Sequence, residues 1–400
     1  MTTQEGNVND ATMKTERVLA ALEHREADRV PIGEFFWTNF IRRAKAELDV
    51  GDDFDPYRYW DLDLVVVTPN MDPHLTGIQV IEDTPERTLV KTRFDATIER
   101  RSTYPMPHYN DFDTKTYEQM EAFEFDDPKD PRRFFEQLDD QINSVGDALN
   151  LGLPPWIDRL NNYADEFCVF GAVCEPHEIL WRTMGTENVL MKLAEGPDRM
   201  ATFIERIGDF MVGVAEAEIE AADGKLTGMY IWGDVAYDKG MFFSPTYWRY
   251  VYKPQVARIC DVCHAAGLKT IYHGCGNASP VFEDLIEAGV DGYNPLEAKA
   301  GLDVLKLKRQ FGSRWAFDGN IDVQVLETND RDLVRGEVLR KLNAAKGGGF
   351  ILQSDHSMPD NVNPATYDYV IKLAREHGTY PLDLGEFDED VRGGILGDGR

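Results

Sequence analysis

The sequence predicts a single α/β domain, a distorted (β/α)8 barrel of the TIM type, with an inserted antiparallel hairpin near residues 74–109. Apolar strand patterns alternate one for one with helical patterns from about residue 166 onward. Repeated βα units favour a parallel sheet, and the strand candidates number about eight, which is the count that closes such a barrel. A glycine-rich dinucleotide-binding fingerprint does not follow the first strand, which disfavours the competing open, doubly wound sheet.

The predicted elements begin with a helix in TERVLAALEHR, followed by a turn and a short strand in DRVPIGEFFW. A second strand, DLVVVTPN, ends near Asn70. Between His74 and Tyr109, apolar and polar residues alternate and turn formers separate the runs, which predicts the inserted hairpin. The later strand candidates are FCVFGAV, GMYIWGDVA, LKTIYHGCG, VDGYNP, RWAFDGN and GGFILQSDH, with helical patterns at 201–222, 247–266, 280–288, 304–310 and 332–345.

The domain organisation that we predict is a flexible tail over residues 1–14, one barrel domain over 15–385 and an acidic tail over 386–400. The first fifteen residues are polar and lack the features of a secretory signal, and no apolar run is long enough to cross a bilayer. We therefore expect a cytoplasmic protein without membrane association. The net charge of −29 repels phosphate backbones, so nucleic acid is a poor candidate partner. Five cysteines in 400 residues do not indicate a disulfide framework.

Polar side chains follow nearly every predicted strand. Active sites of such barrels lie at the carboxyl ends of the strands, where the βα loops converge. The residues at these ends are Glu34, Trp37, Glu175, His177, Glu178, Asp234, Tyr237, His273, Cys275, Asn294, Glu297, Asp318, Asn320, Asp322, Asp355 and His356. Several of them can bind a metal or transfer protons, which predicts a functional site at this end.

The segment IYHGCGN allows three interpretations. It can be a glycine-rich turn with an incidental cysteine, a zinc or other soft-metal site, or a Cys-His nucleophilic dyad. The dyad is disfavoured because side chains at positions i and i+2 of a strand end point in parallel. Imidazole nitrogen and thiolate sulfur are ligands that zinc prefers, so His273 and Cys275 favour the metal site, with His356, Asp234 and Glu175 as further candidate ligands.

Five longer stretches resemble the uroporphyrinogen decarboxylase superfamily: TERVLAALEHREADRVP, YIWGDVAYDKGMFFSPTYWRYVYKP, GLKTIYHGCGNASPVFEDLIEAGVDGYNPLE, FGSRWAFDGNIDVQVLET and GGGFILQSDHSMPDNV. This resemblance implies a distorted (β/α)8 barrel. Asp234 and His356 match positions shared across the family. The arginine-rich segment of the true decarboxylases is replaced by PIGEFFWTNF, their tyrosine by Trp181 and their serine by Val235. The resemblance is therefore closer to the branch of cobalamin-dependent methyltransferases and O-demethylases.

In the thiol-using methyltransferases of that branch, zinc is held by a His-x-Cys pair and a later cysteine. His273 and Cys275 match the pair, whereas no cysteine follows Cys275, and His356 lies near the expected place. The resemblance thus implies a zinc site of His273, Cys275 and His356 with Glu175 or Asp234. The predicted function is a zinc-dependent methyltransferase that moves a methyl group between a small donor, for example a methoxylated aromatic, and a corrinoid protein or thiol.

The residue roles expected for this reaction fall into two groups. Catalytic roles are assigned to Asp234, His356 and Glu34, and substrate contacts to Trp37, Phe36, Tyr237, Asn320 and His177, with Phe35 adding to an apolar pocket. The corrinoid (cobalamin) is expected on a partner protein and not tightly bound to this chain, and a homodimer is compatible with the sequence. Two alternatives stay open: a metal-free lyase related to uroporphyrinogen decarboxylase, using Asp234 and His356 on a carboxylated substrate, and a non-catalytic binding barrel.

Overall fold

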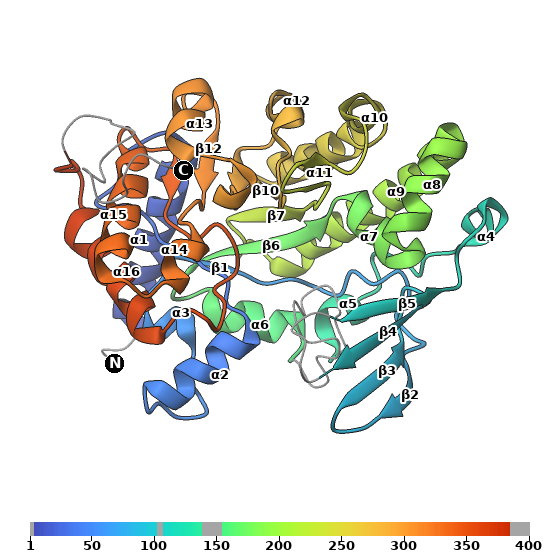
Figure 1. Cartoon of the computed structure of the whole chain (residues 1–400), viewed down its shortest axis with the longest axis horizontal. Coiled ribbons are helices and arrows are strands. Elements are labelled where there is room, and N and C mark those ends of the chain that lie inside the picture. Colours follow the sequence, from blue (N-terminus) through green and yellow to red (C-terminus); the bar gives the residue numbers. More distant parts are fainter. Residues whose placement is uncertain (1–3, 102–106, 138–153, 385–400) are drawn as a thin grey trace.

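A curled sheet of seven parallel strands forms the centre of the computed structural model (Figure 1). The structure describes residues 4–101, 107–137 and 154–384, so the predicted acidic tail lies outside the described residues. The strand order is β1-β6-β7-β10-β11-β12-β13. The strands are β1 Leu64–Val66, β6 Cys168–Cys174, β7 Gly228–Trp232, β10 Lys269–His273, β11 Gly292–Asn294, β12 Ala316–Asp318 and β13 Phe350–Ile351. Each lies within a segment that the sequence predicts to be a strand, except that β6 extends one residue beyond FCVFGAV, to Cys174.

The eighth position of the barrel is taken by an extended segment, residues 30–33, and not by a full strand. Leu352 N–H donates to Pro31 O at 2.9 Å, and Gly33 N–H donates to Leu352 O at 3.0 Å. On the other side, Asp63 N–H donates to Ile32 O at 2.8 Å. The segment therefore connects the two edges of the curled sheet. Pro31 has no N–H to donate, which explains why the predicted strand forms only isolated bridges here.

Helices cover the outer face of the sheet, and several begin with a proline, whose missing N–H costs nothing in the first turn. The longer ones are α1 Gln4–Leu22, α2 Thr38–Glu47, α6 Trp156–Tyr163, α7 Pro176–Met184, α8 Thr186–Glu195, α9 Pro197–Ala222, α11 Lys253–Ala265, α13 Val304–Phe311, α15 Arg331–Leu342 and α16 Pro364–His377. The shorter ones are α3 Pro56–Tyr59, α4 Tyr117–Ala122, α5 Arg132–Phe135, α10 Pro245–Val251, α12 Phe282–Glu287 and α14 Val323–Glu327. No helix among the described residues is long and apolar enough to span a bilayer.

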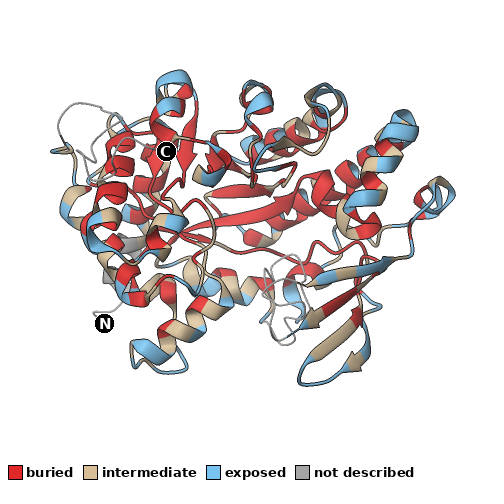
Figure 2. Ribbon diagram, in the orientation of Figure 1, coloured by how far each residue is buried: buried red, intermediate tan, exposed pale blue. Residues whose placement is uncertain are grey.

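The interior of the barrel is a separate apolar cluster closed by α1 at the amino ends of the strands. Phe170, Tyr230 and Ile271 from three strands pack there with Val18 and Leu22 of α1, all at most 4% exposed. Figure 2 shows the central strands as almost entirely buried. Helix α1 begins at Gln4 and so includes most of the stretch 1–14 that the sequence predicts to be a tail; this stretch contains no proline to interrupt the helix.

The inserted region is a four-stranded antiparallel sheet, in place of the single hairpin that the sequence predicts. Its strands, in the order β2-β3-β4-β5, are Gln79–Asp83, Arg87–Lys91, Ala96–Arg101 and His108–Phe112. Two tight turns follow one another within the segment, one closed by Thr84 N–H to Arg87 O and one containing Asp95 at a φ of 56°. The sheet stands apart from the barrel strands at the lower right of Figure 1.

Candidate metal centre

The turn after β10 holds the His273-Gly-Cys275-Gly-Asn277 segment in a fixed shape. Gly276 has a φ of 75°, in the left-handed region that favours glycine. A Cβ at this position would lie 2.6 Å from the backbone of Tyr237, the residue that ends the two-residue strand β8 Ala236–Tyr237. Asn277 N–H donates to Tyr237 O at 2.9 Å. Glycine is therefore needed for this turn to fit against the β8 loop, and the fit places Cys275 at the mouth of the barrel.

The imidazole of His273 is oriented so that Nε2 faces the mouth. Its Nδ1 lies 2.6 Å from Asn294 Oδ1, and the amide nitrogen of Asn294 donates to Asp318 O at 3.1 Å. Because that second bond fixes which amide atom is the oxygen, Nδ1 is the donor and Nε2 keeps its lone pair. Burial lowers the pKa of His273 to about 4, so the ring is neutral near pH 7. A neutral imidazole with a free Nε2 can bind a metal.

Four possible metal ligands surround the Cys275 thiol and make a set of five with it. In one group, ligand atoms of Asp234, His273 and Cys275 lie within 4.8 Å of one another, and in a second group so do those of Cys275, Glu297 and His356. Cys275 Sγ is 3.6 Å from His273 Nε2, which in turn is 3.9 Å from Asp234 Oδ1. The set provides sulfur, nitrogen and oxygen donors, which together suit zinc.

Two carboxylates of this set also fasten the turn. Asp234 Oδ1 accepts the Cys275 N–H at 2.8 Å, and Glu297 Oε2 accepts the Gly276 N–H at 3.1 Å. Burial and the carboxylates of Asp234 and Glu297 raise the pKa of the Cys275 thiol well above its usual value. A divalent cation among these groups would reverse that effect, because it favours the thiolate and offsets the carboxylate charges. The donor set therefore fits a metal ion.

Aromatic side chains form the floor beneath these groups. Phe35 makes an edge contact with Tyr230 at a centroid distance of 5.6 Å and packs on Trp232 at 5.5 Å and His273 at 6.2 Å. Trp37 lies parallel to the ring of His356, with centroids 5.9 Å apart. Phe35 and Trp37, two residues of the predicted apolar pocket, thus contact two candidate ligands, His273 and His356.

Glu34 is linked to the same region through Ser354. The Ser354 hydroxyl lies 2.6 Å from Glu34 Oε1 and also contacts the backbone oxygen of His356. A hydroxyl has one hydrogen, so both contacts are satisfied together when the carboxyl group carries a proton. Burial raises the pKa of Glu34 to about 8, in agreement with a protonated carboxyl near neutral pH.

The side chains of four other predicted site residues contact residues outside the five candidate ligands. Phe36 faces the helix layer and packs on Phe40 and Trp60. The His177 ring packs on Phe243, its Nδ1 lies 3.3 Å from the Tyr252 hydroxyl, and burial lowers its pKa to about 3. Asn320 donates to Leu302 O at 3.0 Å and accepts from Lys341 Nζ at 2.6 Å. Tyr237 is 46% exposed and stacks on Phe242.

Glu175, predicted as a metal ligand, belongs to neither group. Its Oε1 accepts from Trp248 Nε1 at 2.9 Å, and the side chain is fully buried. Helix α7 begins with Pro176, directly after Glu175, and the carboxylate of Glu175 binds Trp248 in place of joining either ligand group. Glu297 supplies the missing carboxylate, and its signal in the sequence was its place just after a strand end, in NPLE.

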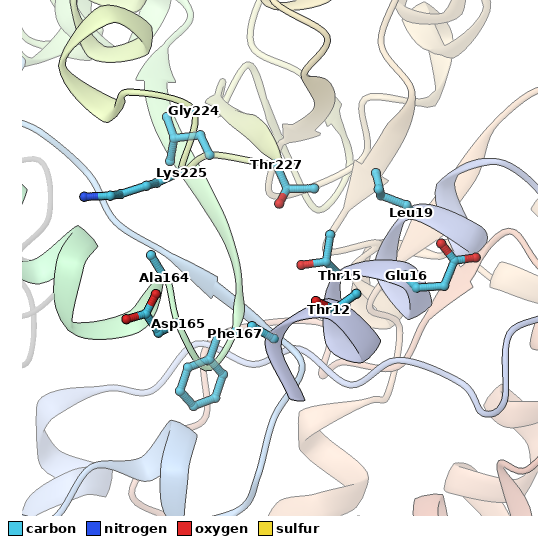
Figure 3. Close-up of a pocket in the computed structure, with 12 residues that line it drawn as sticks. Thr12, Thr15, Glu16, Leu19, Ala164, Asp165, Phe167, Gly224, Lys225 and Thr227 are labelled. Carbon is cyan, nitrogen blue, oxygen red and sulfur yellow. The ribbon is translucent and has the colours of Figure 1, made fainter. Parts of the chain in front are cut away.

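A cavity of about 470 Å³ lies at the opposite end of the barrel (Figure 3). Thr15 and Glu16 of α1 form one wall, and Phe167 and Thr227, which precede β6 and β7, form the other. Since the strands are parallel, this cavity is at their amino ends and is separate from the Cys275 mouth.

The model of the uroporphyrinogen decarboxylase family matches residues 137–377, more than half of the 400 residues. The chain belongs to the uroporphyrinogen decarboxylase family. The segments after β7, β10 and β13, which carry Asp234, Cys275 and His356, all lie within the matched range. No curated protein sequence matches this chain.

Solved structures add a likeness of fold to this family membership. The structure of a methyltransferase from Methanosarcina mazei has a TM-score of 0.61 at 16% identity, covering 91% of this chain and 98% of that chain. At such an identity the likeness shows a shared fold. A putative vitamin-B12 independent methionine synthase from Listeria monocytogenes has a TM-score of 0.38 at 14% identity, covering 57% of this chain and 71% of that chain, which supports no inference.

Proposed function

We propose that this member of the uroporphyrinogen decarboxylase family is a zinc-dependent methyltransferase, which moves a methyl group between a small donor and a corrinoid protein or a thiol. The observation that carries the proposal is the position of the Cys275 thiol. Its sulfur lies within 4.8 Å of ligand atoms of Asp234 and His273, and within the same distance of ligand atoms of Glu297 and His356. Bound zinc would supply Lewis acidity and hold a thiolate or polarise a donor oxygen.

The other residues at the mouth suit a methyl donor with an apolar or aromatic body. Phe35, Trp232 and Trp37 offer ring faces and edges beside the ligands. Glu34, protonated near pH 7, is a candidate proton donor to a leaving oxygen. The methoxylated aromatic donor, and a corrinoid brought by a partner protein, are part of this proposal.

The test measures the metal content of the purified protein by mass spectrometry in wild type, Cys275→Ser and His273→Ala. Cys263→Ser is the matched control, because Cys263 is buried in α11 and belongs to neither ligand group. We expect about one zinc per chain in wild type and control and less than about a tenth of that in both variants. Methyl transfer from methylcobalamin to a thiol should disappear in the same two variants. Wild type without metal, after preparation in the presence of zinc, would contradict the proposal.

A further inference from the structure

A chain of hydrogen bonds connects the inserted sheet to the Cys275 turn. Arg182 Nη1 donates to the hydroxyl of Tyr109, on β5, at 3.1 Å, and Arg182 Nη2 donates to Glu178 Oε2 at 3.3 Å. Glu178 Oε1 accepts the backbone N–H of Asp234 at 3.1 Å. Asp234 Oδ1 accepts the N–H of Cys275 at 2.8 Å. Four consecutive contacts thus link a strand outside the barrel to the main chain of Cys275 at its mouth.

The middle of this chain is shielded from water. Glu178 is 4% exposed, and the side chain of Arg182 is 16% exposed. The guanidinium of Arg182 lies 4.5 Å from the ring centroid of Trp181, whose ring packs edge-on against Tyr109. Charged hydrogen bonds are stronger than neutral ones, and weak screening in a buried site strengthens them further, so these contacts hold Glu178 in place.

The inserted sheet also docks closely at the end of α7, the helix that carries Glu178 and Arg182. Gly185 follows α7 with a φ of 79°, and a Cβ there would lie 2.5 Å from the ring of Phe112 on β5. The sheet therefore contacts both the end of the helix and its buried arginine, and a shift of β5 would be transmitted to Glu178.

We propose that Glu178 and Arg182 are positioning residues through which the inserted sheet sets the place of Asp234 beside Cys275. Glu178 fixes the main chain of Asp234, and Cys275 N–H fixes its carboxylate, so the residue is held at both ends. Without the glutamate, the loop after β7 would lose its buried acceptor and the carboxylate would move away from the thiol. The inference rests on the proposed function, in which Asp234 is a candidate metal ligand.

The experiment uses Cys275 itself as the reporter. It is half-buried, whereas the other four cysteines are buried, so its alkylation by iodoacetamide in the metal-free folded protein, mapped by peptide mass spectrometry, reports on its surroundings. The variants are Glu178→Gln, which removes the charged acceptor, and Tyr109→Phe, which removes one hydroxyl and keeps the ring. In Glu178→Gln, the carboxylate of Asp234 should no longer hold the Cys275 turn, so we expect Cys275 to react about threefold or more faster than in wild type. In Tyr109→Phe, we expect a smaller increase of the alkylation rate.

Two control variants match these changes elsewhere. Glu337 is also buried, and its carboxylate accepts the N–H of a loop aspartate, Asp322, at 3.1 Å. It also pairs with a basic residue four positions on, Lys341, at 3.4 Å. The loop that contains Asp322 carries none of the five candidate ligands. The Tyr117 hydroxyl donates to Lys192 O at 2.9 Å, away from Glu178. Glu337→Gln and Tyr117→Phe should leave the reactivity of Cys275 unchanged.

A Co²⁺ titration of the same proteins separates this inference from the proposed function. We expect the affinity for Co²⁺, followed by the cobalt–thiolate absorption, to fall about tenfold in Glu178→Gln and to stay unchanged in the controls. Wild type without Co²⁺ binding would contradict the proposed function, while the alkylation rates would still decide the role of Glu178. Alkylation rates of Glu178→Gln and Tyr109→Phe equal to those of the controls would overturn the inference.

Discussion

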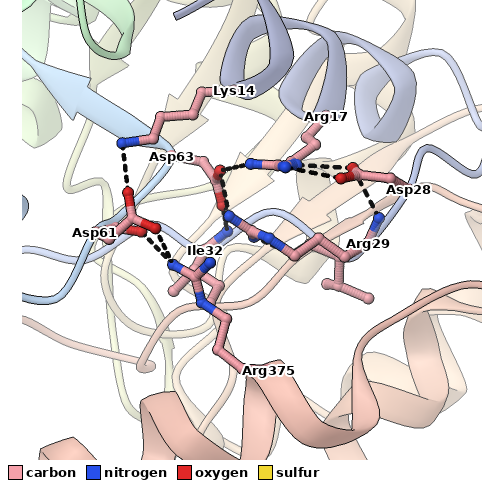
Figure 4. A network of polar contacts seen from close by, with 9 residues as sticks. Lys14, Arg17, Asp28, Arg29, Ile32, Asp61, Asp63 and Arg375 are labelled. Carbon is pink, nitrogen blue, oxygen red and sulfur yellow. Dashed lines mark hydrogen bonds and ion pairs between the residues drawn. The ribbon is translucent and has the colours of Figure 1, made fainter. Parts of the chain in front are cut away.

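The two ends of the barrel use the same charged residue types for different purposes. At the amino end, the fully buried Asp63 accepts from Arg17 Nη1 at 3.0 Å, from Arg29 Nη1 at 2.6 Å and Nη2 at 2.8 Å, and from Ile32 N–H at 2.8 Å (Figure 4). At the carboxyl end, the carboxylates of Asp234 and Glu297 accept backbone N–H bonds and face a thiol and two imidazoles.

This difference separates a structural from a functional arrangement. The Asp63 carboxylate has guanidinium partners from α1 and from the segment before the barrel, which offset its charge. These contacts hold three parts of the chain together. The Cys275 group instead concentrates ligands that repel one another when deprotonated, an arrangement that a cation stabilises. Lys299 Nζ, 3.5 Å from Glu297 Oε1, is a half-exposed partner at the edge of the group.

The largest expected effect is a loss of stability caused by a substitution at the amino end of the barrel. Asp63→Asn removes the charge that Arg17 and Arg29 share, and leaving buried guanidinium groups without it should lower the free energy of unfolding by about 3–5 kcal/mol. Urea denaturation measures this. Asp209→Asn is the control, because Asp209 pairs with Arg258 at 2.7 Å and both side chains are exposed, so the loss should stay below about 1 kcal/mol. Equal losses in both variants would remove the contrast between buried and exposed pairs.

A second, smaller effect tests the orientation of His273 at the carboxyl end. Asn294→Leu removes the oxygen that accepts from Nδ1, so the ring loses its fixed tautomer. We expect the affinity for zinc, measured by chelator competition, to fall about 10- to 100-fold. Asn343→Leu changes another buried asparagine, one that lies in the turn after α15, and should leave zinc affinity unchanged. Unaltered affinity in Asn294→Leu would show that the ring does not need this bond.

The third effect is a change in the pH dependence of stability and concerns the protonated carboxyl group of Glu34. Its pKa is raised from 4.5 to about 8 in the folded chain, so its contribution to stability is complete below about pH 4.5 and is lost as pH rises through about 8. Glu34→Gln cannot titrate, so its unfolding free energy should fall less steeply between about pH 5 and 8, by up to about 1.4 kcal/mol per pH unit. Denaturation profiles across this range, with the exposed Glu124→Gln as control, measure the difference; parallel profiles for wild type and Glu34→Gln would contradict the raised pKa.

Residues predicted for the site differ in outcome because strand ends continue in different ways. His273 and Cys275 keep the direction of β10 and reach the mouth as expected. Asn320 lies two residues after β12, but a φ of 76° turns its side chain toward the carbonyl groups of neighbouring loops. The sequence predicts both Phe35 and Phe36 for the apolar pocket, because alternation in an irregular, bridge-only segment does not show which side chain faces inward. Such turns are set by contacts between loops, which a single sequence does not record.

The sequence by itself determined the alternation of strands and helices, the parallel sheet and the His273-x-Cys275 pair, because periodicity and strand-end chemistry are local properties. It also determined the family, through stretches long enough to be specific. Only the tertiary structure decided that Glu297 and not Glu175 joins Cys275, that α1 closes the amino end of the barrel, and that the inserted sheet reaches Asp234 through Arg182. These three features depend on how each helix is oriented relative to its strand and on which distant segments of the chain meet. Both are set by the packing of the whole chain.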